Sequence, residues 1–168
     1  MVDAPEPKIT ICLKPCDSDL VKVSLAIVKQ MQTIQSFIED DSFVATTTVI
    51  PLPNVTTFQL SKIIDYLNYH RNDKAVAGDV KESAKKFDEE FVKKLEHDQL
   101  KESLLAANYL NVKETLDFLC QAVADLIKDK SVKFVRKFFG IVNDYSIEEE
   151  KEIRSTSAWA FEDVEEDY

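Results

Sequence analysis

The sequence predicts an α+β fold in which a small sheet near the start of the chain is followed by helices. Apolar side chains alternate over residues 8–14, as they do on a strand with one buried face. All five prolines lie within the first 53 of the 168 residues, so the remaining 115 residues contain no proline to interrupt a helix. From Leu100 onward, apolar residues recur at three- and four-residue intervals, which is typical of helices with one buried stripe.

Three short strands are predicted. The alternating segment 8–14 is the first, and the β-branched run at 20–23 follows turn residues and completes a hairpin with it. The third strand covers residues 46–50 and stops at Pro51 and Pro53, because proline cannot donate a hydrogen bond to a sheet ladder.

Two short helices are predicted between the second and third strands. Ser24 caps the first and Thr33 caps the second, since each hydroxyl can accept a hydrogen bond from a free amide of the first turn. Ile34, Phe37 and Ile38 have the spacing of one buried stripe on the second helix.

A longer helix is predicted to begin at Asn54 or Thr56 and to end near Tyr69 or His70. After it, 11 of the 20 residues in segment 71–90 are charged, and large apolar residues are few. This composition favours a solvated segment over a buried one, so we expect a long surface loop there.

The centre of the fold is predicted to be a pair of helices. The first ends at Leu110, and the second carries a continuous apolar stripe over residues 112–127. Cys120 lies in that stripe, where a buried structural thiol is the usual state of a cysteine.

Two further helices are predicted after this pair. Ser131 caps one that stops at Gly140, and Ser146 forms a capping box with Glu149 at the start of the other. The last helix offers little apolar surface of its own, yet Trp159 follows it. An aromatic side chain without a core to join is typical of an anchor for a partner protein.

Charge and glycine content exclude several classes of function. The net charge is -10, and residues 148–168 contribute -7 of it. Such a chain repels the phosphates of nucleic acids, so we expect no binding of DNA or RNA. We expect a solvated acidic end. Gly78 and Gly140 are the only glycines and lie 62 positions apart, which excludes a glycine-rich phosphate-binding loop.

Catalytic and metal chemistry are poorly supported by the sequence. His70 and His97 stand among polar residues and are expected at the surface. Cys12 and Cys16 have no nearby histidine or second cysteine pair to complete a metal site. We therefore expect no enzymatic activity, no metal and no cofactor. No apolar run is long enough to span a membrane and no signal peptide is evident, so we expect an intracellular protein without membrane partners.

Particular strings, rather than periodicity, resemble a known family. They are residues 50–55 (IPLPNV), 105–113 (LAANYLNVK), 143–150 (NDYSIEEE) and 158–159 (AW). In this order and spacing they closely resemble the S-phase kinase-associated adaptor family of SCF ubiquitin ligases, and the match runs from about residue 8 to 161.

This resemblance implies a BTB/POZ-like α+β domain, with a small three-stranded sheet and helices, over residues 8–128. That domain binds a cullin and includes the charged segment 71–90. A two-helix extension over residues 131–161 binds F-box proteins, and residues 162–168 form an acidic tail. By the same resemblance the protein is a non-catalytic adaptor that bridges a cullin N-terminal domain to F-box substrate receptors, in the cytoplasm and nucleus.

The resemblance also implies site residues by position. Asn108 and Tyr109 match cullin-facing positions. Eight residues match positions that line or border the F-box side: Leu116, Cys120, Val123, Ile127, Ile141, Asn143, Tyr145 and Trp159. For Leu116, Val123 and Ile127, ordinary core packing is the alternative reading.

The chain departs from the family pattern at several places. Lys101 and Ser103 stand where the family is usually apolar, Glu114 replaces a usual glycine, and Phe87 replaces a tryptophan. Residues 132–134 read Val-Lys-Phe in place of Pro-Glu-Glu, which removes the acidic first turn of that helix. These departures indicate a divergent member with a narrower set of F-box partners or weaker cullin binding.

Two alternatives remain open. One is a self-associating POZ-type scaffold that acts outside a ligase, and a homodimer of the free chain is compatible with either reading. The other is a small hydrolase with a reactive nucleophile near His70 or His97. The extension 131–161 favours the adaptor, because a scaffold has no need of it in this form.

Overall fold

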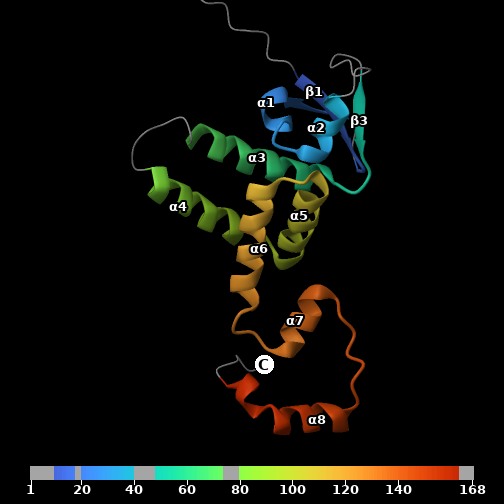
Figure 1. The fold of residues 1–168 in the computed structure, drawn as a ribbon, viewed down its shortest axis with the longest axis vertical. Helices are drawn as coiled ribbons and strands as arrows, with labels where there is room; N and C mark the ends of the chain where they lie inside the picture. Colours follow the sequence, from blue (N-terminus) through green and yellow to red (C-terminus); the bar gives the residue numbers. More distant parts are fainter. Residues whose placement is uncertain (1–9, 18–19, 40–47, 74–79, 163–168) are drawn as a thin grey trace, which may run out of the picture. The chain divides into compact units, whose positions relative to one another are not determined.

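A computed structural model shows an α+β fold, as predicted (Figure 1). It divides into two compact units, residues 1–120 and 121–168. The described residues are 10–17, 20–39, 48–73 and 80–162. None of the helices in these ranges is both long and apolar enough to cross a membrane.

The first unit contains a three-stranded sheet of order β2-β1-β3. Strand β1 (Thr10–Pro15) pairs antiparallel with β2 (Val21–Ser24), which confirms the predicted hairpin. It pairs in parallel with β3 (Val49–Leu52) on its other side. Alternate residues of β1, Ile11 and Leu13 among them, are fully buried, as the alternation predicted.

The predicted end of the third strand was wrong. Residues 46 and 47 lie outside the described residues, and the strand continues through Pro51, which pairs with Lys14, to the buried Leu52. Strand β3 lies at an edge of the sheet, where only one side needs ladder hydrogen bonds. A proline is tolerated in that position, although it would not be in a central strand.

Two short helices, α1 (Leu25–Val28) and α2 (Gln32–Ile38), follow the hairpin. Ser24 stands at the start of α1 as predicted, but its hydroxyl forms no capping bond. Met31, not Thr33, precedes α2. The helices form because their apolar side chains, Ile27 and Met31 among them, pack against the core rather than because their ends are capped.

Two predictions for α2 were wrong. Thr33 lies inside the helix, and its hydroxyl donates to the backbone carbonyl of Tyr109 at 2.7 Å. The proposed stripe is incomplete, since Ile34 is buried while Phe37 is 56% exposed. The helix therefore buries a narrower face than its apolar residues suggested.

Helix α3 (Thr57–Asp73) begins directly after Thr56, one of the two predicted starts, and ends later than the predicted Tyr69 or His70. The Thr56 amide donates to Gln59 Oε1 at 2.8 Å, and the Gln59 amide donates to the Thr56 hydroxyl. Asp17, in the turn after β1, accepts from both the amide and the hydroxyl of Thr57. These bonds hold the pKa of Asp17 below its ordinary value.

The expected surface loop over residues 71–90 was wrong for most of its length. Helix α3 continues to Asp73, residues 74–79 lie outside the described residues, and helix α4 spans Val80–Lys93. Glu82, Lys85, Lys86, Glu89 and Glu90 of α4 are exposed, whereas Asp88 is half-buried beside His70. Phe87 and Phe91 lie one turn apart and supply the buried face, which the count of charged residues concealed.

Helices α5 (His97–Leu110) and α6 (Lys113–Ile127) confirm the predicted central pair. A capping box between Glu96 and Gln99 begins α5. Asn111, in a left-handed conformation with φ 52°, ends it. Helix α5 packs against both α3 and α2.

The second unit contains the end of α6, then α7 (Val132–Phe139), α8 (Ile147–Thr156) and the 3-10 helix η1 (Ala158–Phe161). The Ser131 hydroxyl accepts from the Phe134 amide, and Gly140 ends α7 with φ 68°, as predicted. The predicted capping box at Ser146 is also present. Residues 163–168 of the predicted acidic tail lie outside the described residues.

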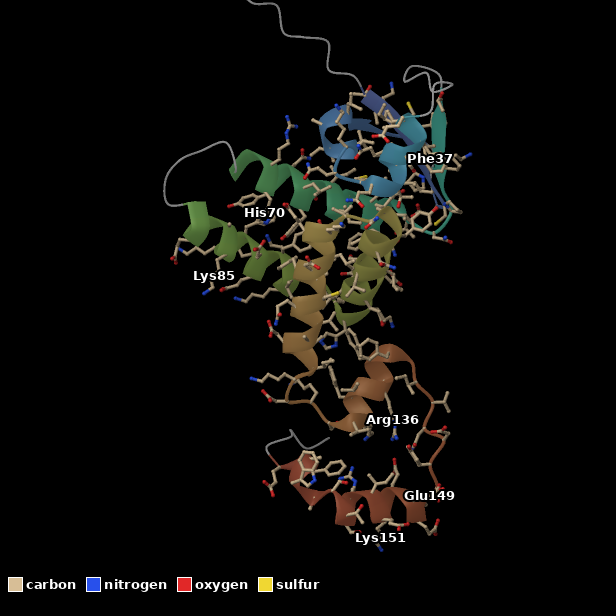
Figure 2. The ribbon with its side chains drawn as sticks, viewed as in Figure 1. Phe37, His70, Lys85, Arg136, Glu149 and Lys151 are labelled. Carbon is tan, nitrogen blue, oxygen red and sulfur yellow. The ribbon has the colours of Figure 1, made fainter. Side chains whose placement is uncertain are left out.

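The surface position predicted for His70 was wrong. It is half-buried between α3 and α4, with Nε2 2.8 Å from Asp88 Oδ1 (Figure 2). Its ring packs on Tyr66 at a centroid distance of 4.3 Å. Phe87 stacks on Tyr69 at 3.7 Å. His70 thus helps to hold α4 on α3, whereas His97 is exposed as predicted.

Candidate functional site

The second unit exposes an unusual amount of apolar surface. Among described residues 128–162, Phe138 is the only buried apolar side chain. Val142, Ile147 and Trp159 are 83%, 81% and 76% exposed. Five more apolar or aromatic side chains are also exposed: Val132, Phe139, Ile141, Tyr145 and Ile153. Large apolar side chains exposed in such numbers within one short segment indicate a site of protein association.

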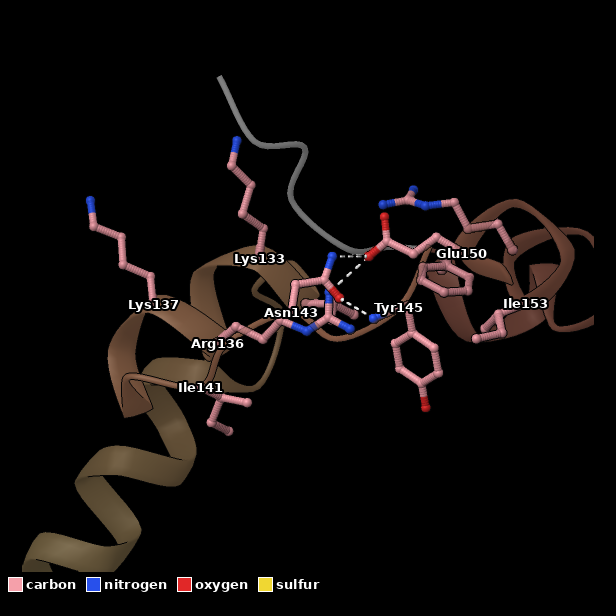
Figure 3. A pocket seen from close by; sticks show the side chains of 11 residues that line it. Lys133, Arg136, Lys137, Ile141, Asn143, Tyr145, Glu150 and Ile153 are labelled. Atoms are coloured by element: carbon pink, nitrogen blue, oxygen red, sulfur yellow. Dashed lines mark hydrogen bonds and ion pairs between the residues drawn. The ribbon is translucent and has the colours of Figure 1, made fainter. Parts of the chain in front are cut away.

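Part of this surface forms a groove of about 640 Å³, which we call the α7–α8 groove (Figure 3). It is bounded by α7, by α8 and by the segment 141–145 that joins them. Its apolar lining is Val132, Ile141, Tyr145, Ile153 and Phe161. Capped helix ends position these walls, because Gly140 turns the chain out of α7 and Ser146 starts α8.

A carboxylate joins the walls of the groove. Glu150 Oε1 accepts hydrogen bonds from Arg136 Nη1 at 2.8 Å and from Asn143 Nδ2 at 2.9 Å. Asn143 Oδ1 in turn accepts from the Tyr145 amide at 3.2 Å. The Arg136 hydrogen bond, followed by that of Asn143, holds the pKa of Glu150 below its ordinary value. One side chain of α8 thus binds both α7 and the connecting segment.

Two guanidinium groups lie over aromatic rings that line the groove. Arg136 lies 5.7 Å from the centroid of Tyr145, and Arg154 lies 5.1 Å from that of Phe161. Such contacts orient aromatic side chains that are otherwise only partly packed. Contacts with Arg136 and Arg154 therefore hold Tyr145 and Phe161 in place at the groove. The apolar lining stays open to solvent, because few buried side chains lie in this unit to pack against it.

Three of the residues predicted for the F-box side meet at this groove. Ile141, Asn143 and Tyr145 all line it, two as apolar surface and Asn143 through its bond to Glu150. Trp159 does not line it, but is exposed on η1. Ile141, Asn143 and Tyr145 stand 9, 7 and 5 positions before Glu150. The end of α7 at Gly140 and the start of α8 at Ser146 place them on one groove.

The remaining predicted F-box residues lie along α6. Val123 is buried, which fits the core alternative, while Leu116 and Ile127 are half-buried. Cys120 is exposed, so the expected buried thiol was wrong. Its neighbour Leu119 takes the buried place on the helix instead.

Sequence reasoning missed the polar centre of the groove. Arg136 carried no assigned role, and Glu150, Ile153 and Phe161 were not predicted as site residues. An ion pair between residues 14 positions apart leaves no periodic signal in a sequence. The motif at residues 143–150, together with the predicted position of Ile141, was the signal that pointed to this place.

The predicted cullin-facing residues lie at the end of α5. Asn108 is exposed, and Tyr109 is half-buried. Two bonds tie this end to α2: the Thr33 hydroxyl donates to the Tyr109 carbonyl, and Asn111 Nδ2 donates to Gln32 Oε1 at 2.9 Å. The side chain of Asn108 is thereby presented from an ordered turn.

The structure shows what surrounds three residues that depart from the family pattern, namely Lys101, Ser103 and Glu114. Lys101 forms an ion pair with Asp98 at 3.2 Å on the surface of α5. Ser103 is buried, and its hydroxyl has no hydrogen-bond partner. Glu114 is exposed in the first turn of α6, and with Asp88 it adds to the effect of burial in raising the pKa of Tyr66.

Comparisons with known proteins agree with the resemblance. Residues 9–72 match the tetramerisation domain of the Skp1 family, and residues 113–160 match its dimerisation domain. The chain is 41% identical to SKP1-like protein 20 of Oryza sativa subsp. japonica, over 94% of this chain and 97% of that protein. The chain belongs to the Skp1 family.

Other Skp1 family relatives show a similar degree of identity. SKP1-like protein 10 of Arabidopsis thaliana is 44% identical and SKP1-like protein 13 is 42% identical, each over 90% of this chain and 97% of the relative. Membership of the Skp1 family supports an SCF adaptor role in general, rather than an enzymatic one.

Proposed function

We propose that this chain bridges a cullin to F-box substrate receptors in an SCF ubiquitin ligase, for ubiquitin-dependent protein degradation in the cytoplasm and nucleus. It catalyses no reaction itself and needs no cofactor. The observation that carries this proposal is the extension of residues 131–161, which exposes apolar side chains that its own thin core cannot cover.

The F-box partner is assigned to the second unit because of this apolar surface. A partner helix with apolar anchors would cover the α7–α8 groove and remove Ile141 and Tyr145 from water. Burial of apolar area stabilises a complex by about 25 cal/mol per Å², before the cost of ordering the partners. Trp159 offers a further large exposed anchor.

The cullin is assigned to the end of α5. Asn108 is exposed there, and the hydrogen bonds from Thr33 and Asn111 order the turn in advance of binding. Preorganised groups lose less conformational entropy when a partner docks. The two proposed surfaces have no residue in common, so neither partner needs the residues assigned to the other.

Co-purification with a cullin N-terminal domain and with an F-box protein tests this assignment. We expect the pair Asn108→Glu and Tyr109→Glu to abolish cullin binding alone, and the pair Ile141→Asp and Tyr145→Asp to abolish F-box binding alone. Asn68→Glu, at an exposed position of α3, is the matched control and should retain both partners. If either pair removes both partners or neither, the two-surface proposal is wrong.

The scaffold alternative makes a different prediction. The Skp1 family domains that match this chain are described as dimerisation and tetramerisation domains, and the exposed apolar side chains offer a surface for self-association. For an adaptor, adding an F-box protein should convert any homodimer into a 1:1 complex, as measured by light scattering after gel filtration. A homodimer that persists at saturating F-box protein would favour the scaffold.

A further inference from the structure

The charge of the α7–α8 groove is opposite to that of the chain. Four basic side chains, Lys133, Arg136, Lys137 and Arg154, line it together with one acidic side chain, Glu150. The lining therefore carries a net charge of +3, on a chain with a net charge of -10. A basic surface this localised favours a partner of the opposite charge.

Two of the four basic groups are already engaged within the unit. Arg136 is paired with Glu150 at 2.8 Å, and Arg154 lies over the ring of Phe161. Lys133 and Lys137 are exposed, and neither forms an ion pair with a described residue. In Figure 3 both extend from α7 in the same direction.

The spacing of these lysines costs helix stability. Like charges four residues apart on a helix destabilise it by about 0.2–0.5 kcal/mol. Helix α7 carries no acidic residue in its first turn to offset this repulsion. Lys133 also stands where the resemblance places an acidic residue. This edge of the α7–α8 groove therefore carries the opposite charge to the one that the resemblance implies.

We propose that the α7–α8 groove selects F-box segments that carry Asp or Glu beside their apolar anchors, and that Lys133 and Lys137 read this charge. The inference rests on the proposed function and adds the chemical class of partner. Apolar contacts supply most of the affinity, whereas rim charges supply discrimination, because a like-charged partner is repelled. Of the two lysines, Lys133 is the one whose charge differs from that implied by the resemblance, so its substitution is the sharper test.

Two synthetic F-box helix peptides of identical apolar sequence test the proposal. One carries Glu and the other Lys at the positions that flank the anchors. By fluorescence anisotropy at low salt, the full chain should bind the Glu peptide about five- to tenfold more tightly, which corresponds to one or two exposed charge pairs. The preference should shrink at high salt, because exposed charges are screened.

Lys133→Glu should lose the preference for the Glu peptide or reverse it. Lys151→Glu is the matched control, since it makes the same change of charge at an exposed lysine of α8 that does not line the groove (Figure 2). It should retain the preference. Equal binding of both peptides by the full chain, or equal effects of the two substitutions, would overturn the inference and leave the adaptor function standing.

Two further outcomes are decisive. If the full chain binds neither peptide and no F-box protein, the proposed function falls and the inference falls with it. The alternative occupant of the α7–α8 groove is the chain's own acidic end. A variant that ends at Glu162 lacks this end, so it distinguishes the two occupants. Unchanged affinity of that variant for the Glu peptide supports a partner in the groove. A tenfold gain would overturn the proposal and assign the groove to the acidic end.

Discussion

Ser103 is a buried side chain whose hydroxyl has no hydrogen-bond partner. It is 1% exposed on α5, the helix that ends at the proposed cullin-binding residues. A buried hydroxyl without a partner loses its hydrogen bonds to water and gains none in exchange. The resemblance implies an apolar residue at this place, so Ser103 lowers the stability of the first unit without an evident structural gain.

We expect Ser103→Ala to raise the free energy of unfolding by about 1 kcal/mol, since it removes an unsatisfied hydroxyl and improves helix propensity. Urea denaturation followed by circular dichroism measures this change. Ser61→Ala, at an exposed position inside α3, corrects for propensity alone. A gain no larger than that of Ser61→Ala would show that the hydroxyl finds a partner in solution.

Glu150 makes the second unit sensitive to acid. Hydrogen bonds from Arg136 and Asn143 lower its pKa in the folded chain from the ordinary 4.5. A carboxyl group with a lowered folded pKa stabilises the fold above its ordinary pKa, and this contribution is lost as the pH falls through the folded value. The contacts between α7 and α8 should therefore weaken only below about pH 4.5.

Carbon-detected NMR of the Glu150 carboxyl group should show a midpoint below 4.5 in the full chain. Arg136→Gln should raise that midpoint toward 4.5, because it removes the first of the two donors and the positive charge. Lys151→Gln, which removes an exposed positive charge of α8 that does not donate to Glu150, is the matched control and should leave the Glu150 midpoint unchanged. A Glu150 midpoint that does not respond to Arg136→Gln would contradict the hydrogen-bond network.

At the scale of an element, helix α4 packs against α3 mainly through aromatic side chains. Phe87 stacks on Tyr69 with an interplanar angle of 3°, and Phe91 contacts Tyr66 edge to face at 5.5 Å. The pair of His70 and Asp88 adds a hydrogen bond beside these rings. The Tyr69 hydroxyl donates to the Ser83 carbonyl at 3.1 Å, and Phe91 also contacts Phe118 of α6 at 6.1 Å. The docking of α4 therefore depends on a small set of contacts around Phe87 and Phe91.

We expect Phe87→Ala to cost about 2 kcal/mol, roughly half the value for a fully buried phenylalanine, because Phe87 is half-buried. The loss should be local. Hydrogen exchange should accelerate in residues 80–93, while the amides of β1 and α5 stay protected. Phe37→Ala, at a residue 56% exposed, is the matched control and should leave exchange in α4 unchanged. Loss of protection throughout the first unit would show that α4 is part of its core.

At the scale of the whole molecule, the two units differ in how much core they possess. The first unit buries a continuous set of aliphatic side chains from the sheet, α3 and α5, including Leu13, Leu60 and Leu110. In the extension, Phe138 is the only buried apolar side chain among described residues 128–162. A segment with so little buried surface opens more readily than one around a full core.

Hydrogen exchange of the free chain should therefore be faster in α7 and α8 than in α3 and α5. Binding of an F-box protein should slow exchange in residues 131–161 by at least tenfold, since a ligand that binds only the folded form stabilises it. Binding of a cullin domain should leave that segment unchanged. Equal protection of both units in the free chain would contradict the thin core.

Much of this architecture follows from local patterns. The hairpin, the central pair of helices and the caps at Ser131, Gly140 and Ser146 are visible in the sequence, because alternation, helical spacing and capping chemistry are properties of short segments. The errors arose where long-range contacts decide the outcome. The number of charged residues in segment 71–90 predicted a solvated loop. In the structure, Phe87 stacks on Tyr69 and Phe91 contacts Tyr66, so a helix packs there.

The sequence by itself determined the fold class, the family and three groove residues, Ile141, Asn143 and Tyr145. Only the tertiary structure decided that Glu150 joins Arg136 to Asn143, that Cys120 is exposed and that Thr33 bonds to Tyr109. The physical reason is that strand and helix signals repeat over a few residues. An ion pair or a hydrogen bond between distant segments depends on where the whole chain brings them.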